Sequence, residues 1–119
     1  MNLEKTVVGA LEDLKARDIV VLNVGDISTV AETMVIASGT SNRHVKALAD
    51  NAAFEAKQQG RKPIGVEGAD VAEWVLVDFG DLIVHVMLPH TRAFYDLESL
   101  WTLKPNAERA KQGDESGVE

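Results

Sequence analysis

The chain has 119 residues and no cysteine, which excludes disulfides, thiolate metal sites and cysteine nucleophiles. Its formal net charge of −7 disfavours general nucleic-acid binding, because an acidic surface repels phosphate backbones, and favours a basic protein partner instead. The length predicts a single domain, and without a signal peptide or an apolar run near the roughly 18 residues of a membrane span we expect a cytoplasmic protein with no membrane partner.

Two helices and two strands are predicted in the first half of the chain. Apolar residues at helical spacing indicate a helix over residues 2–16, and the β-branched apolar run over residues 19–24 predicts a strand that is buried on both faces. A second strand is expected over residues 33–38. The small-residue turn at 39–42 then caps a helix whose alanine-rich stripe ends before Gly60 and indicates close packing against a sheet.

The clearest element of the second half is a β-hairpin, preceded by a short edge strand at residues 64–66. Two β-rich runs, 74–79 and 82–87, are separated only by Gly80 and Asp81, and a two-residue Gly-Xaa linker is typical of a tight hairpin turn.

After the hairpin, Pro89 begins a helix that is expected to continue to Trp101. The stretch that follows is polar and aromatic-free. The sequence therefore predicts one α/β domain over residues 1–101, with helices packed on a mixed β-sheet, and a flexible polar tail over residues 102–119.

The two-residue loop sets the register of the hairpin, with Phe79 opposite Leu82, and side chains then alternate between two faces. One face is wholly apolar and is expected to lie under the helices: Val75, Val77, Phe79, Leu82, Val84 and Val86. The other face is mixed: Trp74, Leu76, Asp78, Ile83, His85 and Met87. Protein interfaces are rich in Trp, Tyr, Met and Arg, so this mixed face is either a second core face or a partly open docking surface. The aromatic residues between 92 and 101 would extend the docking surface in the second interpretation.

Sites for metal, anion or nucleotide chemistry are weakly supported. Asp78 and Asp81 flank the hairpin turn and could hold magnesium, but turn chemistry already explains an Asp in such a loop. The turn at 38–41 could hold an anion at a helix start, but capping explains it equally well and it lacks the lysine and spacing of a phosphate-binding loop. None of the three histidines stands at the spacing of a metal site. We therefore expect no metal, no cofactor and no catalytic residue.

Several separated motifs, in one order over residues 3–101, resemble the ribosomal silencing factor (Iojap) family. They are DIS at 26–28, MVIASG at 34–39, SNRHV at 41–45, EG at 67–68, EWVLVDFGD at 73–81, VHVM at 84–87, TRAFYDLE at 91–98 and LW at 100–101. The resemblance implies a nucleotidyltransferase-like topology. Enzymes of that topology use a Gly-Ser turn and paired carboxylates on a strand. Here Thr40 follows Gly39, and strand 74–79 offers only Asp78, so we expect no enzyme.

The resemblance also implies a partner, the fourteenth of the universal large-subunit ribosomal proteins, on the face that meets the small subunit. Binding there would block subunit joining and repress translation when nutrients are short. The binding surface that it implies consists of Glu73, Trp74, Leu76, Asp78, His85, Met87, Arg92, Tyr95, Asp96 and Leu97. No free nucleic acid is expected as a partner, and a homodimer is left open. The alternatives are a minimal nucleotidyltransferase-like enzyme that binds magnesium and nucleotide through Asp78 and Asp81, and an RNA-binding module, which the net charge disfavours.

Overall fold

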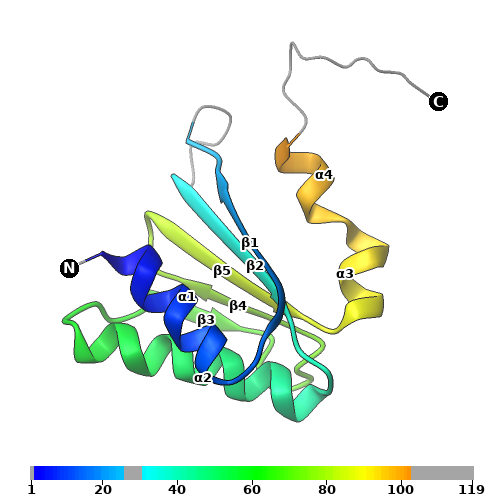
Figure 1. Ribbon diagram of the computed structural model, residues 1–119, viewed down its shortest axis with the longest axis horizontal. Coiled ribbons are helices and arrows are strands. Elements are labelled where there is room, and N and C mark those ends of the chain that lie inside the picture. Colours follow the sequence, from blue (N-terminus) through cyan, green and yellow to red (C-terminus); the bar gives the residue numbers. More distant parts are fainter. Residues whose placement is uncertain (1, 26–30, 103–119) are drawn as a thin grey trace.

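The computed structural model describes residues 2–25 and 31–102, and in this part of the chain nine elements form a five-stranded sheet with helices on both faces (Figure 1). In chain order they are α1 (Leu3–Asp13), β1 (Arg17–Asn23), β2 (Thr33–Ser38), α2 (Asn42–Gln58), β3 (Gly65–Glu67), β4 (Trp74–Asp78), β5 (Leu82–Met87), α3 (Pro89–Tyr95) and α4 (Leu97–Thr102). The strand order is β1-β2-β5-β4-β3, with β2 and β5 parallel and the other neighbours antiparallel. The expectation of an α/β fold with helices on a mixed sheet is confirmed.

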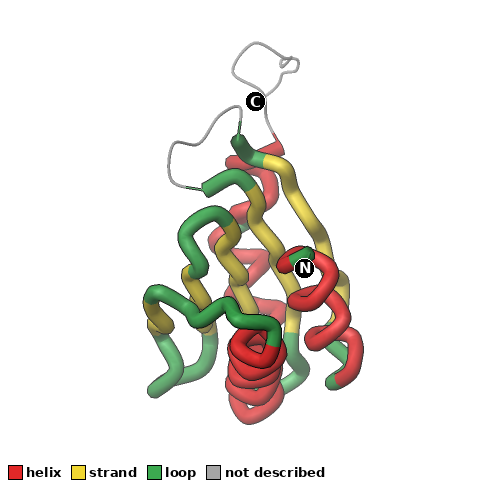
Figure 2. The backbone as a smooth tube through the Cα atoms, turned by 90° about the vertical axis from the view of Figure 1, so that its left-hand side faces the viewer, coloured by secondary structure: helices red, strands yellow, loops and turns green. Residues whose placement is uncertain are grey.

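The larger core lies between the sheet and the helices α1 and α2. Figure 2 shows these two helices in front of the strands, with α3 and α4 behind them. Every residue of the apolar hairpin face is buried in this core, together with the alanine-rich stripe of α2. Short alanine side chains let α2 lie close to the strands, and its ends are set locally. The Ser41 hydroxyl accepts from the His44 backbone N–H at 3.1 Å, and Gly60 has φ +89° beyond the last turn.

The hairpin register is confirmed at every paired position of β4 and β5. Trp74 lies opposite Met87, and Asp78 lies opposite Ile83. The Phe79 N–H donates to the Leu82 carbonyl at 2.9 Å and closes the two-residue loop. Strand β3 pairs with β4 at the far edge of the sheet, one residue later than predicted.

A smaller apolar cluster occupies the opposite face of the sheet. Val24, Met34, Ile36 and Met87 are its buried members, and Leu22, Trp74 and Leu97 pack against them. Because Leu97 belongs to α4, the two C-terminal helices cover the part of this face that β1, β2 and β5 provide. The mixed face of the hairpin is therefore core at one end and partly open at the other.

Two expectations about elements are wrong. Strand β1 is not buried on both faces, because it lies at the edge of the sheet with β2 as its only neighbouring strand among the described residues, and Val21 is exposed. The segment from Pro89 does not form one helix. Asp96 adopts the left-handed conformation, with φ 48° and ψ 52°, and separates α3 from α4. The tail is predicted over residues 102–119; its first residue, Thr102, ends α4, and the others lie outside the described residues.

Candidate protein-binding surface

Three aromatic side chains meet where β4 and the end of α3 come together, and we call them the aromatic surface: Trp74, Phe94 and Tyr95. The ring centroids of Trp74 and Tyr95 lie 4.8 Å apart, and those of Tyr95 and Phe94 lie 5.0 Å apart, edge to face. Phe94 is 80% exposed and Tyr95 is 52% exposed, while Trp74 is half-buried. Rings that pack on one another and still face water are typical of interfaces, since covering them releases a large apolar area.

Beneath the aromatic surface, the indole of Trp74 is held by a histidine. Its Nε1–H donates to Nδ1 of His85 at 2.9 Å, and His85 is only 5% exposed. Burial lowers the pKa of His85 to about 4, because desolvation penalises the imidazolium. The ring is therefore neutral at pH 7. An indole N–H can only donate, so Nδ1 is the acceptor and Nε2 carries the proton.

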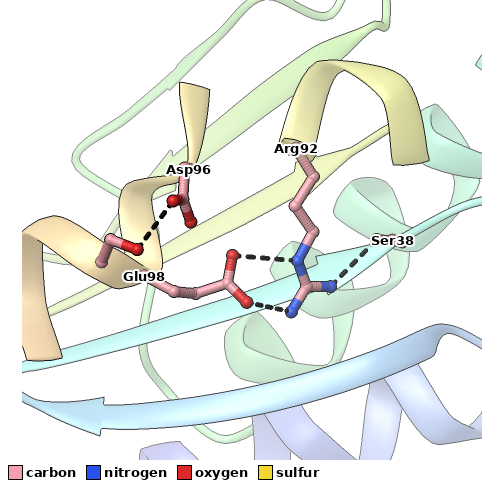
Figure 3. A network of polar contacts seen from close by, with 5 residues as sticks. Ser38, Arg92, Asp96 and Glu98 are labelled. Atoms are coloured by element: carbon pink, nitrogen blue, oxygen red, sulfur yellow. Dashed lines mark hydrogen bonds and ion pairs between the residues drawn. The ribbon is translucent and has the colours of Figure 1, made fainter. Parts of the chain in front are cut away.

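An ion pair fixes the elbow between α3 and α4. Figure 3 shows the Arg92 guanidinium between Glu98 and Ser38. Its Nε and Nη2 donate to the two carboxylate oxygens of Glu98 at 3.1 and 2.8 Å, and its Nη1 donates to the Ser38 hydroxyl at 2.9 Å. Beside this pair, Asp96 accepts from the Ser99 hydroxyl at 2.7 Å. These bonds tie both short helices to β2 and so set where Tyr95, the last residue of α3, stands.

The part of the chain that carries the aromatic surface is rich in acidic residues. Residues 64–102 contain seven Asp or Glu and a single Arg, which is the buried Arg92 paired with Glu98. This third of the chain therefore carries a formal charge of −6, nearly all of the −7 of the whole sequence. Glu73 and Asp96, which flank two of the three rings in the sequence, are both exposed. Exposed acidic residues next to the rings favour a basic partner, because opposite potentials attract across an interface.

The structure separates the ten residues that the sequence assigns to binding by their exposure. Glu73, Tyr95 and Asp96 are exposed, Trp74, Leu76, Asp78 and Leu97 are half-buried, and His85, Met87 and Arg92 are buried. Met87 has no exposed surface, so it supports the aromatic surface from beneath and cannot touch a partner directly. The reason is that α4 and Trp74 itself pack over the cluster that contains Met87.

Phe94 is missing from that set, although its side chain is 80% exposed. The concentration of aromatic residues between 92 and 101 is the only signal for it in the sequence. Helical spacing by itself leaves Phe94 equally compatible with the core.

The two aspartates of the hairpin turn each have a separate partner. Asp78 accepts from the Gly80 N–H at 2.8 Å, and Asp81 accepts from Nη2 of Arg61 at 2.7 Å, a hydrogen bond that lowers the pKa of Asp81. In residues 2–25 and 31–102, no three His, Asp or Glu side chains converge as metal ligands would.

The small-residue turn before α2 is likewise engaged in local bonds. The Thr40 N–H donates to Nδ1 of His44 at 2.9 Å, the Ser41 hydroxyl caps α2, and the Ser38 hydroxyl accepts from Arg92. These bonds support the capping interpretation of the turn.

The chain is similar in sequence to proteins of one family. A family model described as "Ribosomal silencing factor during starvation" matches residues 1–118. A relative from Chromobacterium violaceum named "Ribosomal silencing factor RsfS" is 46% identical over 100 residues, which cover 84% of this chain and 82% of the relative. A mouse relative named "Mitochondrial assembly of ribosomal large subunit protein 1" is 39% identical over 100 residues, covering 82% of this chain and 44% of the relative.

The fold agrees with a crystal structure of a Chromobacterium violaceum protein. The TM-score is 0.83 at 44% sequence identity, and the match covers 92% of this chain and 93% of that one. No helix in the described residues is long and apolar enough to cross a membrane. Matched in sequence over nearly its whole length and in fold over most of it, the chain belongs to the ribosomal silencing factor family.

Proposed function

We propose that this chain acts in the cytoplasm by binding the fourteenth protein of the universal set on the large ribosomal subunit. Membership of the family makes it a ribosomal silencing factor and implies binding to the large subunit, without an enzymatic step. The particular protein partner comes from the sequence resemblance. A factor seated on the face that meets the small subunit represses translation by steric exclusion when nutrients are short.

The observation that carries this proposal is the exposed pair of rings on α3, of which Tyr95 packs on Trp74 and Phe94 packs on Tyr95. Binding energy at interfaces is concentrated in a few aromatic and arginine anchors, whereas the surrounding contacts mainly exclude water. Phe94 and Tyr95 have the exposure that such anchors need, and Trp74 holds Tyr95 from below. An interface of about 1,600 Å² in total is typical of a stable protein pair and would extend from these rings over β4 and α3.

The acidic character of residues 64–102 supports the same class of partner. Ribosomal proteins are typically basic, and residues 64–102 carry a formal charge of −6. Complementary charge of this kind accelerates association and is screened by salt. The same charge disfavours naked RNA as the ligand, because phosphate backbones would be repelled.

Sedimentation of purified large subunits with the wild-type chain and with Tyr95→Ala tests the proposal. We expect the variant to lose at least ~2 kcal/mol of binding free energy, about 30-fold in affinity, as at an interface hot spot. Phe54→Ala is the matched control, because Phe54 is 55% exposed on α2, on the other side of the sheet, and its loss should leave binding unchanged.

The same mixtures, supplied with small subunits, report on subunit joining. Wild-type chain should reduce the joined ribosome peak, and Tyr95→Ala should do so only at about 30-fold higher concentration. Cross-linking from a photoreactive residue at position 94 should then capture the fourteenth large-subunit protein. Failure of the wild-type chain to sediment with large subunits would refute the proposal, and capture of a different ribosomal protein would refute the choice of partner.

A further inference from the structure

The mixed face of the hairpin contains a buried imidazole at a position where an aliphatic side chain would need no hydrogen-bond partner. In the sheet, His85 lies between Ile36 of β2 and Leu76 of β4, both of them aliphatic. A buried polar side chain costs stability unless its polar atoms are hydrogen-bonded. His85 is 5% exposed, and its Nδ1 accepts a hydrogen bond from the Trp74 indole. The hydrogen bond from Trp74 therefore explains how an imidazole is accommodated at this buried position.

The geometry gives the Trp74 indole two fixed contacts. Trp74 and His85 are diagonal neighbours across the antiparallel pair, since Trp74 lies opposite Met87 and His85 lies opposite Leu76. The indole N–H points to His85 at 2.9 Å, and the ring packs on Tyr95 with centroids 4.8 Å apart. A bond at the nitrogen and a ring contact together determine the side-chain torsions of Trp74.

We propose that His85 is a positioning residue, whose Nδ1 orients the Trp74 indole so that the aromatic surface is already arranged for the large ribosomal subunit before binding. This inference rests on the proposed function and adds a residue that acts without touching the partner. Without an acceptor at this position, the indole N–H would be left unsatisfied in a half-buried setting and would turn toward water. Tyr95 would then lose the surface on which it packs, and the partner would have to order both rings.

Pre-organisation of this kind raises affinity by removing the entropy cost of ordering side chains during binding. For one or two ring systems the expected loss is about tenfold in affinity. The neutral state of His85 supports the assignment, because burial keeps its pKa far below 7 and leaves the Nδ1 lone pair available. The ion pair between Arg92 and Glu98, which holds α3, does not involve His85.

Two substitutions separate positioning from mere filling of space. His85→Leu keeps an apolar side chain of similar size and removes the acceptor, whereas His85→Asn places a carbonyl oxygen close to the position of Nδ1. We expect His85→Leu to weaken binding of purified large subunits about tenfold, and His85→Asn to remain within about threefold of the wild type. The indole ¹H–¹⁵N resonance of Trp74, assigned by its loss in Trp74→Phe, should move in His85→Leu and return toward its wild-type position in His85→Asn.

The effect of His85→Leu measured in a Trp74→Phe background tests the positioning role even if His85→Leu also destabilises the fold. Trp74→Phe removes the donor, so adding His85→Leu to it should change affinity by less than about twofold. Equal losses from His85→Leu in both backgrounds, or an unmoved indole resonance, would overturn the positioning role. If wild type binds and Tyr95→Ala does not, but His85→Leu binds normally, only this inference fails. If the wild type itself does not bind large subunits, the proposed function fails and takes this inference with it.

Discussion

The buried imidazole of His85 should make the stability of this fold depend on pH. An exposed histidine titrates near 6.5, whereas burial lowers the pKa of His85 to about 4 in the folded chain. Between these two values the unfolded chain binds a proton that the folded chain excludes. The free energy of unfolding should therefore fall as the pH falls from 6.5 to about 4, and this contribution should level off at lower pH.

The size of the effect follows from the difference between the two pKa values. Each pKa unit corresponds to 1.36 kcal/mol, so the full titration of His85 should lower the free energy of unfolding by about 3 kcal/mol. For a domain of this size that is a substantial part of the usual 5–15 kcal/mol. Most of the loss should be present by pH 4.5, where denaturant titrations remain practical.

The assay compares the wild type with His85→Asn, which cannot titrate at this position. Urea unfolding followed by circular dichroism at pH 7.5, 6.5, 5.5 and 4.5 gives a free energy of unfolding for each chain. The carboxylates are the same in both proteins, including Asp78 and Glu98 on the same side of the sheet, so their effects cancel in the difference. That difference should shrink by about 3 kcal/mol on acidification. Parallel pH dependences for the two proteins would refute the reasoning, because they would mean that His85 titrates alike in both states.

Three further substitutions test other parts of the structure by the same urea assay. Gly68→Ala should lose about 2–4 kcal/mol, because Gly68 has φ +87° and an added Cβ would clash with the Trp74 carbonyl oxygen; a loss under about 1 kcal/mol would contradict this. Glu98→Gln should lose about 1–3 kcal/mol by leaving the buried Arg92 without its counter-charge, and a neutral result would show that water replaces the carboxylate. Lys46→Ala should lose under ~0.5 kcal/mol, since its ion pair is exposed, and a larger loss would indicate an unrecognised role.

The exposure of the candidate binding residues could be predicted only in part, and one pair of residues shows the reason. Alternation along the strands places Trp74 and Met87 opposite each other on one face, and both residue types are common in interfaces. The structure leaves Trp74 half-buried and Met87 fully buried, because Leu97 of α4 packs against the cluster around Met87. The alternation of side chains along a strand determines on which face of the sheet each one lies. Whether that face is exposed to solvent depends on the helices packed against it.

Elements whose bonds close within a few residues could be derived from the sequence alone. The two-residue loop and the period of two are enough for the register of β4 and β5, and a serine cap and a glycine stop are enough for the ends of α2. The acidic character of residues 64–102 is likewise a property of composition. The hairpin register and the helix ends depend on local geometry, and the acidic character depends on composition. None of these features is changed by how the rest of the chain folds.

The tertiary structure alone decided the edge position of β1, the break at Asp96 and the hydrogen bond from Trp74 to His85. The place of β1 depends on the parallel pairing of β2 with β5, strands that lie more than 40 residues apart in the chain. The elbow at Asp96 is fixed by the ion pair of Arg92 with Glu98, and Arg92 is itself held by a hydrogen bond to Ser38, 54 residues away. Such contacts form only when distant segments of the chain are ordered together, which costs conformational entropy. No local pattern in the sequence shows which of these contacts stabilise the fold enough to offset that cost.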